Sequence, residues 1–189
     1  PRVVFRANGR ATDTRTILAA LAPPNVILTN KASYLLWPRG DEKDQAYLLG
    51  ILCSLTLDWC ARRMVLKDLN FHIINSLPIP RPKRNNPYWQ RVVEISGRLS
   101  AYDERYSEWA DKVEVAWGPL DREEKDDMVD ELDAIVAHLY GLTESQLIHI
   151  FETFHLGWDN TDSSRGRRPT FRASLENTVI HYQRWTPSH

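Results

Sequence analysis

A run of prolines is the feature that most limits how this chain can fold. It reads Pro78-Ile79-Pro80-Arg81-Pro82, and because proline fixes φ and has no N–H to donate, such a run ends any helix or strand that reaches it. Short β-prone segments precede the run and helical patterns follow it. We therefore expect a stiff boundary between a part with strands, residues 1–80, and a helical part, residues 88–156, with a tail over residues 157–189.

The part before the prolines combines short strands with one long helix. Val3–Phe5 and Thr16–Leu21 are interpreted as strands, although the alanines of the second run also suit a helix. Val26–Leu28 and Ser33–Trp37 are short β-prone runs joined by a hairpin-type connection. From Gln45 to Val65, apolar residues recur at helical spacing. These patterns predict an α+β fold in which a small mixed sheet packs on a long helix and a helical bundle or hairpin layer follows.

The part after the prolines is helical in pattern. Tyr88–Ala116 carries apolar residues three and four positions apart, and a second apolar stripe runs from Met128 to Leu139. Gly141 is the expected C-cap of that second helix, and Thr143 with Gln146 forms a capping box for a third. We expect an αα-hairpin here, and a unit that folds without the first part. The polar tail after residue 159 is expected to be an arm or a loosely ordered end.

The apolar content and the cysteines bear on the compartment. The apolar run Ala46–Leu57 spans about twelve residues, whereas a membrane-crossing helix needs about twenty, so we expect a buried core helix. Cys53 and Cys60 lie seven residues apart on that helix, roughly 10 Å and beyond disulfide reach. No CxxC pair and no secretory signal is present, and the start at Pro1 suggests an internal cut. A reducing cytoplasm is therefore expected.

Charge is divided unevenly along the chain. Residues 1–100 hold 15 Lys and Arg against 7 Asp and Glu, a net charge of +8, and residues 101–189 hold 9 against 18, a net charge of −9. This asymmetry favours a basic surface on the first half and an acidic, solvated or partner-facing second half. The alternative is that acidic helices simply lie beside a basic sheet.

Three blocks in fixed order carry a family resemblance. They are RATDTRTILAALAPPNVILTNKASYLLW from Arg10, LNFHIINSLPIP from Leu69 and ELDAIVAHLYGLTESQLIHIFETF from Glu131. Together they resemble the C-terminal region of large bacterial adenine methyltransferases, namely the type IIG restriction–modification enzymes and the BREX- and DISARM-type methylases. The resemblance covers roughly residues 1–156. It implies the region that chooses the DNA target, with double-stranded DNA and the N-terminal catalytic domain of the same polypeptide as partners.

No block supplies the chemistry of methyl transfer or cleavage. Asn86-Pro87-Tyr88 is one proline short of the motif that holds a flipped base, and no strand–Gly-x-Gly–helix unit for a cofactor is present. Asp41-Glu42-Lys43 and Glu123-Glu124-Lys125 mimic a nuclease spacing but lie in charged runs. The histidines lack metal-ligand spacing with cysteine. We expect no catalysis and no cofactor in this chain, and S-adenosylmethionine to bind in a preceding domain.

DNA contact requires exposed Lys and Arg for phosphates and planar donors for base edges. The loops Leu28–Ala32 and Pro38–Asp44 are candidates for reading bases. The first half, including Arg6, offers such groups. The predicted DNA-binding residues are Arg10, Arg15, Asn30, Lys31, Arg62, Arg63, Lys67, Asn70, His72, Arg81, Lys83 and Arg84.

Several of these residues have a structural alternative. Asp13–Arg15 could form a turn or an ion pair between two lobes, and Arg62 and Arg63 could be helix-end charges. Arg81, Lys83 and Arg84 could keep a linker solvated. The rival function is a protein–protein docking module of a phage-defence methylase complex with little direct DNA contact. An independent hydrolase or nuclease has little support.

Overall fold

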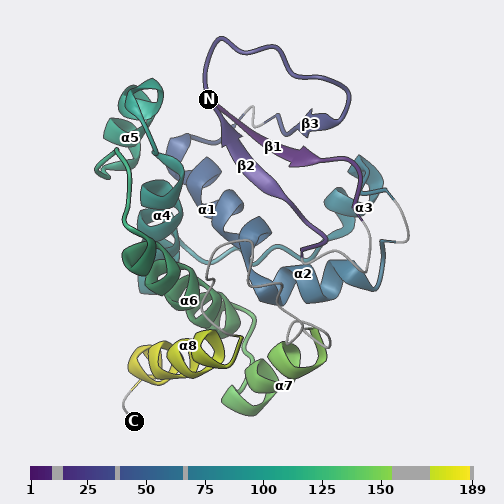
Figure 1. Cartoon of the computed structure of the whole chain (residues 1–189), viewed down its shortest axis with the longest axis vertical. Helices are drawn as coiled ribbons and strands as arrows, with labels where there is room; N and C mark the ends of the chain where they lie inside the picture. The colour runs from purple at the N-terminus through teal and green to yellow at the C-terminus, as the bar shows by residue number, and fades with distance from the viewer. Residues whose placement is uncertain (10–14, 37–38, 66–67, 155–170, 188–189) are drawn as a thin grey trace.

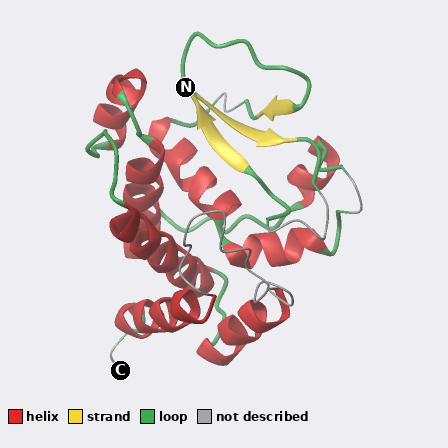
Figure 2. Cartoon of the chain, in the orientation of Figure 1, coloured by secondary structure: helices red, strands yellow, loops and turns green. Residues whose placement is uncertain are grey.

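The computed structural model describes residues 1–9, 15–36, 39–65, 68–154 and 171–187. It confirms an α+β fold, in which a small sheet lies on one side of a larger helical layer (Figure 2). Within the described ranges no helix is long and apolar enough to cross a membrane. The strands are β1 (Arg2–Arg6), β2 (Ala19–Ala22) and β3 (Ala32–Tyr34), and the helices are α1 (Glu42–Cys53), α2 (Leu55–Arg62), α3 (Phe71–Ser76), α4 (Pro87–Ser100), a 3₁₀ turn η1 (Glu104–Tyr106), α5 (Ser107–Val113), α6 (Arg122–Leu139), α7 (Glu144–Phe154) and α8 (Phe171–Trp185).

The sheet has the order β2-β1-β3 and is antiparallel throughout rather than mixed. Alternation along β1 buries Val3 and Phe5 and exposes Arg2 and Arg6, as expected for a sheet with one face on the core. The predicted hairpin is wrong, because Val26–Leu28 lies in a loop and β3 pairs with β1. A short run of β-branched residues does not show which strand it pairs with, because the pairing depends on register and burial.

The predicted helix Gln45–Val65 is two helices that meet at Ser54. The Ser54 hydroxyl donates to the Ile51 carbonyl at 2.7 Å and accepts from the Leu57 N–H at 3.3 Å, so one residue ends α1 and caps α2. Serine is a preferred N-cap because its side chain competes with helical backbone bonding. Apolar residues on both sides of the break made the two helices look continuous in the sequence.

Helix α1 is buried because it lies between the sheet and α4 (Figure 1). The two helices approach each other closely at Gly50, where a Cβ would lie 2.7 Å from Val92 Cγ1. The Ser96 hydroxyl of α4 also donates to the Ala46 carbonyl of α1 at 2.5 Å. Close backbone packing of this kind requires glycine at the contact.

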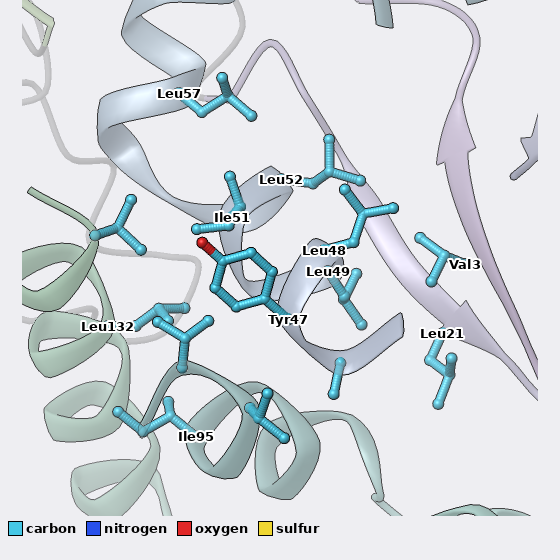
Figure 3. Close-up of a cluster of buried hydrophobic side chains, with 14 of the residues drawn as sticks. Val3, Leu21, Tyr47, Leu48, Leu49, Ile51, Leu52, Leu57, Ile95 and Leu132 are labelled. Carbon is cyan, nitrogen blue, oxygen red and sulfur yellow. The ribbon is translucent and has the colours of Figure 1, made fainter. Parts of the chain in front are cut away.

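One hydrophobic cluster extends across the proline run. Val3 and Leu21 of the sheet, Ile51 of α1 and Ile95 of α4 belong to it (Figure 3), as does Leu132 of α6. The proline run therefore does not mark a boundary between two hydrophobic cores. No observation tests the prediction that residues 88–156 fold without the first part. The shared core argues against it, because α4 and α6 would lose their contacts with α1 and the sheet.

The segment Phe71–Leu77, whose polarity alternates only weakly, contains the short helix α3, which ends at Ser76 with Leu77 as its C-cap. Asn70 caps it by accepting from the Ile73 N–H at 3.0 Å. The predicted capping box is confirmed, whereas the C-cap of α6 is Tyr140, and Gly141 is the left-handed residue that follows it. Gly141 has a φ of 66°, and Thr143 and Gln146 exchange the two hydrogen bonds of a capping box. The chain reverses there as the predicted hairpin requires, but α7 packs against α2 and α8.

The expectation of a loosely ordered C-terminal end is wrong for residues 171–185, which form α8 along α6. Tyr182 stacks on His138 with ring centroids 3.9 Å apart, and Tyr88 stacks on the same imidazole at 5.3 Å. The Trp185 indole donates to Glu131 at 3.0 Å. The polar residues before α8 concealed this aromatic contact face in the sequence. Residues 155–170 lie outside the described ranges.

Candidate nucleic-acid interface

The first half of the candidate interface lies where one end of the sheet meets the start of α3. The Ala7 N–H donates to the Lys31 carbonyl at 3.0 Å, and the Ala7 carbonyl accepts from the Leu69 N–H at 2.7 Å. Phe71 of α3 lies edge-on against Phe5 of β1, with ring centroids 5.4 Å apart. These contacts bring the loop before β3 and the start of α3 to the same end of β1 (Figure 1).

Polar and cationic side chains are exposed at this end of the sheet. Arg6, Asn30, Lys31 and His72 are all solvent-exposed. Asp68 is the acidic residue described there, and its carboxylate accepts from the Asn8 amide at 3.0 Å. This end of the sheet therefore presents donors and positive charge from segments that lie far apart in the sequence.

A groove lies at the other end of α3. Its volume is about 830 Å³, within the range typical of ligand sites. The segment after β3 and helices α1, α3 and α4 form its walls together with the proline run. Its described lining is Leu35, Leu36, Arg39, Gly40, Asp44, Tyr47, Leu48, Leu52, Ile74, Asn75, Leu77, Ile79, Pro80, Arg81, Pro82, Lys83, Arg84 and Trp89.

The rim of the groove is basic, but one of its cations, Arg84, pairs with carboxylates of the same chain. The Arg84 guanidinium bonds to Asp41 at 2.7 Å and to Asp44 at 2.5 Å, and these bonds raise the pKa of Arg84. Arg39, Arg81 and Lys83 are exposed, and no ion pair between described residues involves them. The name α3 face is used below for the exposed polar and cationic residues at the two ends of α3, which are Arg6, Asn30, Lys31 and His72 at its start and Arg39, Arg81 and Lys83 at the groove.

Arg15 lies away from this surface, in a buried ionic cluster between the two halves of the chain. Its guanidinium is 3.5 Å from the Asp133 carboxylate, which is almost fully buried. Asp133 also accepts from the Leu55 N–H at 2.6 Å. Asp58 accepts from the backbone N–H groups of residues 16 and 17, and burial raises the pKa of both carboxylic acids. The ion-pair alternative for Arg15 is the arrangement found.

Arg62 also makes contacts within the fold. Its guanidinium lies over the Phe154 ring at 3.8 Å and donates to the Phe154 carbonyl and to the Thr16 hydroxyl, both at 3.3 Å. It thereby joins the end of α7 to the segment before β2. Arg63 is exposed at the end of α2, with its guanidinium 4.0 Å above the Trp59 ring.

The predicted residues are thus divided among several environments. Asn30, Lys31, His72, Arg81 and Lys83 lie on the α3 face. The side chain of Asn70 caps α3, Arg84 pairs with acidic residues of its own chain, and Arg15 and Arg62 are structural. Arg10 and Lys67 lie outside the described residues.

Sequence reasoning missed two residues of the groove. Arg39 lies in the loop Pro38–Asp44, which the sequence marked as a candidate for reading bases, so its position could have identified it. Asn75 is exposed on α3 and lines the groove. The sequence did not place Asn75 on a helix, because α3 begins with the cap at Asn70 and this cap is recognised only from the local geometry.

The described residues contain no group of three His, Cys, Asp or Glu side chains that could hold a metal ion. Cys53 and Cys60 are free thiols, and burial raises the pKa of Cys53 to about 11, which disfavours a nucleophilic thiolate there. In the comparisons with known proteins, no family model, no curated protein and no solved structure matches this chain.

Proposed function

We propose that this chain is the DNA-recognition region of a bacterial adenine methyltransferase or fused restriction–modification enzyme, and that it binds duplex DNA through the α3 face. The resemblance of the three sequence blocks suggests the enzyme class. The observation that carries the DNA surface is the clustering of exposed cations on both sides of α3, while Arg15 and Arg62 are used inside the fold.

Four residues of the α3 face have a stated chemical role in this proposal. Lys31, Arg81 and Lys83 neutralise phosphates and release counterions. Asn30 belongs to an exposed loop in which Ile27 is 99% exposed, and its amide can pair with a base edge. Phosphate contacts of this kind fix the orientation of the protein, and the loop supplies sequence discrimination.

Chemistry is assigned to a preceding domain of the same polypeptide, which would bind S-adenosylmethionine. Incubation of this chain with duplex DNA, Mg²⁺ and labelled S-adenosylmethionine is expected to give neither methylated nor nicked DNA. Product of either kind that depends on the chain would contradict the assignment.

Titration of a fluorescein-labelled duplex at low salt tests the DNA surface. Replacing Lys31, Arg81 and Lys83 together with alanine is expected to weaken binding at least about tenfold, since three phosphate contacts are removed. Replacing Arg122 and Lys125 with alanine is the matched control, because both are exposed in the acidic half. Equal behaviour of the two variants, or no binding by the wild type, would exclude the α3 face as a DNA surface.

A further inference from the structure

The floor of the groove is apolar, which DNA binding by the rim does not explain. Leu48 and Leu52 of α1 and Ile74 and Leu77 at the end of α3 form much of it. At its mouth, Leu36 is 78% exposed. The four floor side chains are each at most 7% exposed, so Leu36 is the strongly exposed aliphatic side chain of the described lining. The outer surface of duplex DNA is sugar and phosphate, so it could contact the rim cations but would leave Leu36 uncovered.

The walls provide little backbone for an extended partner to pair with. Pro80 and Pro82 in the wall lack N–H donors, and the carbonyl of Pro80 already accepts from the hydroxyl of Tyr47. The walls from α1 and α3 are helical, so their backbone bonds are internal. An occupant that lies against the proline wall and the helical walls must therefore satisfy its own backbone there, which a helix does.

The charges of the rim determine whether the occupant must be acidic or basic. Arg84 with its two carboxylates, Asp41 and Asp44, carries a net charge of −1. Arg39, Arg81 and Lys83 lack an ion-pair partner among the described residues and add +3, so the rim stays positive. Asn75 adds an exposed amide that can donate and accept. An occupant with carboxylates beside an apolar stripe matches both the floor and the rim.

We propose that this groove docks an acidic amphipathic helix of a protein partner, with aliphatic side chains on the floor and carboxylates against Arg39, Arg81 and Lys83. Helix-in-groove recognition uses apolar anchors at i, i+3 or i+4, and i+7. This docking role goes beyond DNA recognition and does not depend on it. Because the rim cations belong to the α3 face as well, partner and DNA compete for Arg81 and Lys83.

A designed peptide of sixteen residues tests the proposal on the full chain. The probe carries leucine at the anchor positions and glutamate on the flanks, and its matched controls carry lysine for each glutamate or serine for each leucine. Fluorescence anisotropy is expected to show binding of the probe, and binding of each control weakened at least about tenfold, or about 1.4 kcal/mol. No binding of the probe, or equal binding of the lysine control, would overturn the proposal.

Two variants separate the floor from the rim. Asn75→Trp fills the groove from an exposed position on α3, and Arg81→Glu with Lys83→Glu reverses the rim. Both are expected to weaken binding of the probe at least about tenfold, while Lys125→Glu in the acidic half leaves it unchanged. Thermal melts of all variants establish that they are folded. Undiminished binding of the probe to folded Asn75→Trp would place the probe outside the groove and overturn the proposal.

The rival occupants give different results. A labelled single-stranded oligonucleotide whose affinity falls in Asn75→Trp would assign the apolar floor to an unstacked base. Light scattering that shows a dimer of the wild type and a monomer of Asn75→Trp would assign the groove to a second copy of the chain. Either result would overturn docking of a partner helix.

Discussion

Arg15 and Lys83 both contribute to the positive charge of the first half, yet they lie in opposite environments. Arg15 faces a buried carboxylate, Asp133, contributed by the acidic half. Lys83 is exposed on the rim of a groove. The difference is the presence of a carboxylate partner from a distant part of the chain. Net charge counted along a sequence therefore overstates the charge that a surface can offer to DNA.

The same comparison explains part of the charge asymmetry. Some of the cations of the first half are balanced by the acidic second half within the fold, as Arg91 is by Glu131 through two hydrogen bonds of 3.0 and 2.7 Å. These pairs hold the halves together and do not attract an external partner. Among the exposed cations of the first half, Lys31, Arg39, Arg81 and Lys83 have no ion-pair partner among the described residues, and we propose that they are available for binding.

The largest expected effect comes from separating the halves. A fragment of residues 86–160 loses the sheet and α1, whose side chains share one cluster with α4 and α6. It also loses α8, whose contacts with α6 are extensive. We expect no cooperative helical melt by circular dichroism, in contrast to the full chain. A cooperative melt of the fragment would restore the two-domain interpretation of the sequence.

Removing the charge of Arg15 tests the buried cluster. Arg15→Met leaves the Asp133 carboxylate buried without its cation and is expected to lower the free energy of unfolding by about 3 kcal/mol. The control is Arg63→Met, which removes an exposed guanidinium of the same half and is expected to change stability by about 0.5 kcal/mol or less. Urea denaturation measures both. Equal changes would mean that the buried pair contributes no more than a surface charge.

Asp130 of α6 differs from Asp133, which faces the Arg15 guanidinium, because the described hydrogen-bond donors of Asp130 are uncharged. Burial raises the pKa of Asp130 to about 6, although the Ser174 hydroxyl and the Asn177 amide stabilise the charged form. The folded state therefore binds the proton more tightly than the unfolded state. Its contribution to stability is fully present below about pH 4 and is lost as the pH rises through 6.

Asp130→Asn keeps the neutral form at every pH. It is expected to match the wild type near pH 4 and to exceed its stability above pH 7, by at most about 3 kcal/mol. Urea denaturation at pH 4.5, 6 and 8 measures the difference. A constant difference between the two proteins across this range would contradict the raised pKa of Asp130.

The parts of the fold that depend on local sequence were predictable. β1 follows from its β-prone run Val3–Phe5, and the turn at Gly141 and the capping box at Thr143 follow from spacing within a few residues. The break at Ser54 was not predictable because the same apolar stripe crosses it. Helix α8 depends on aromatic contacts with α6, which no local pattern shows.

The candidate site was predictable only in part. The exposed positions Lys31, Arg81 and Lys83 were identified from composition and from the family resemblance. Arg15 and Arg62 were included with them because the partners that turn them inward, Asp133 and Phe154, come from the second half of the chain. Long-range pairing decides which cations are exposed, and one sequence does not reveal it.

The salt dependence of DNA binding tests the central claim most directly, that the exposed cations of the α3 face carry the contact. The logarithm of the association constant is measured against the logarithm of salt concentration for the wild type, for Lys31→Ala with Arg81→Ala and Lys83→Ala, and for Arg122→Ala with Lys125→Ala. Each phosphate contact contributes about 0.9 to the slope. We expect the magnitude of this negative slope to fall by about 3 in the α3-face variant and to stay unchanged in the acidic-half variant. Identical slopes for all three proteins would contradict it.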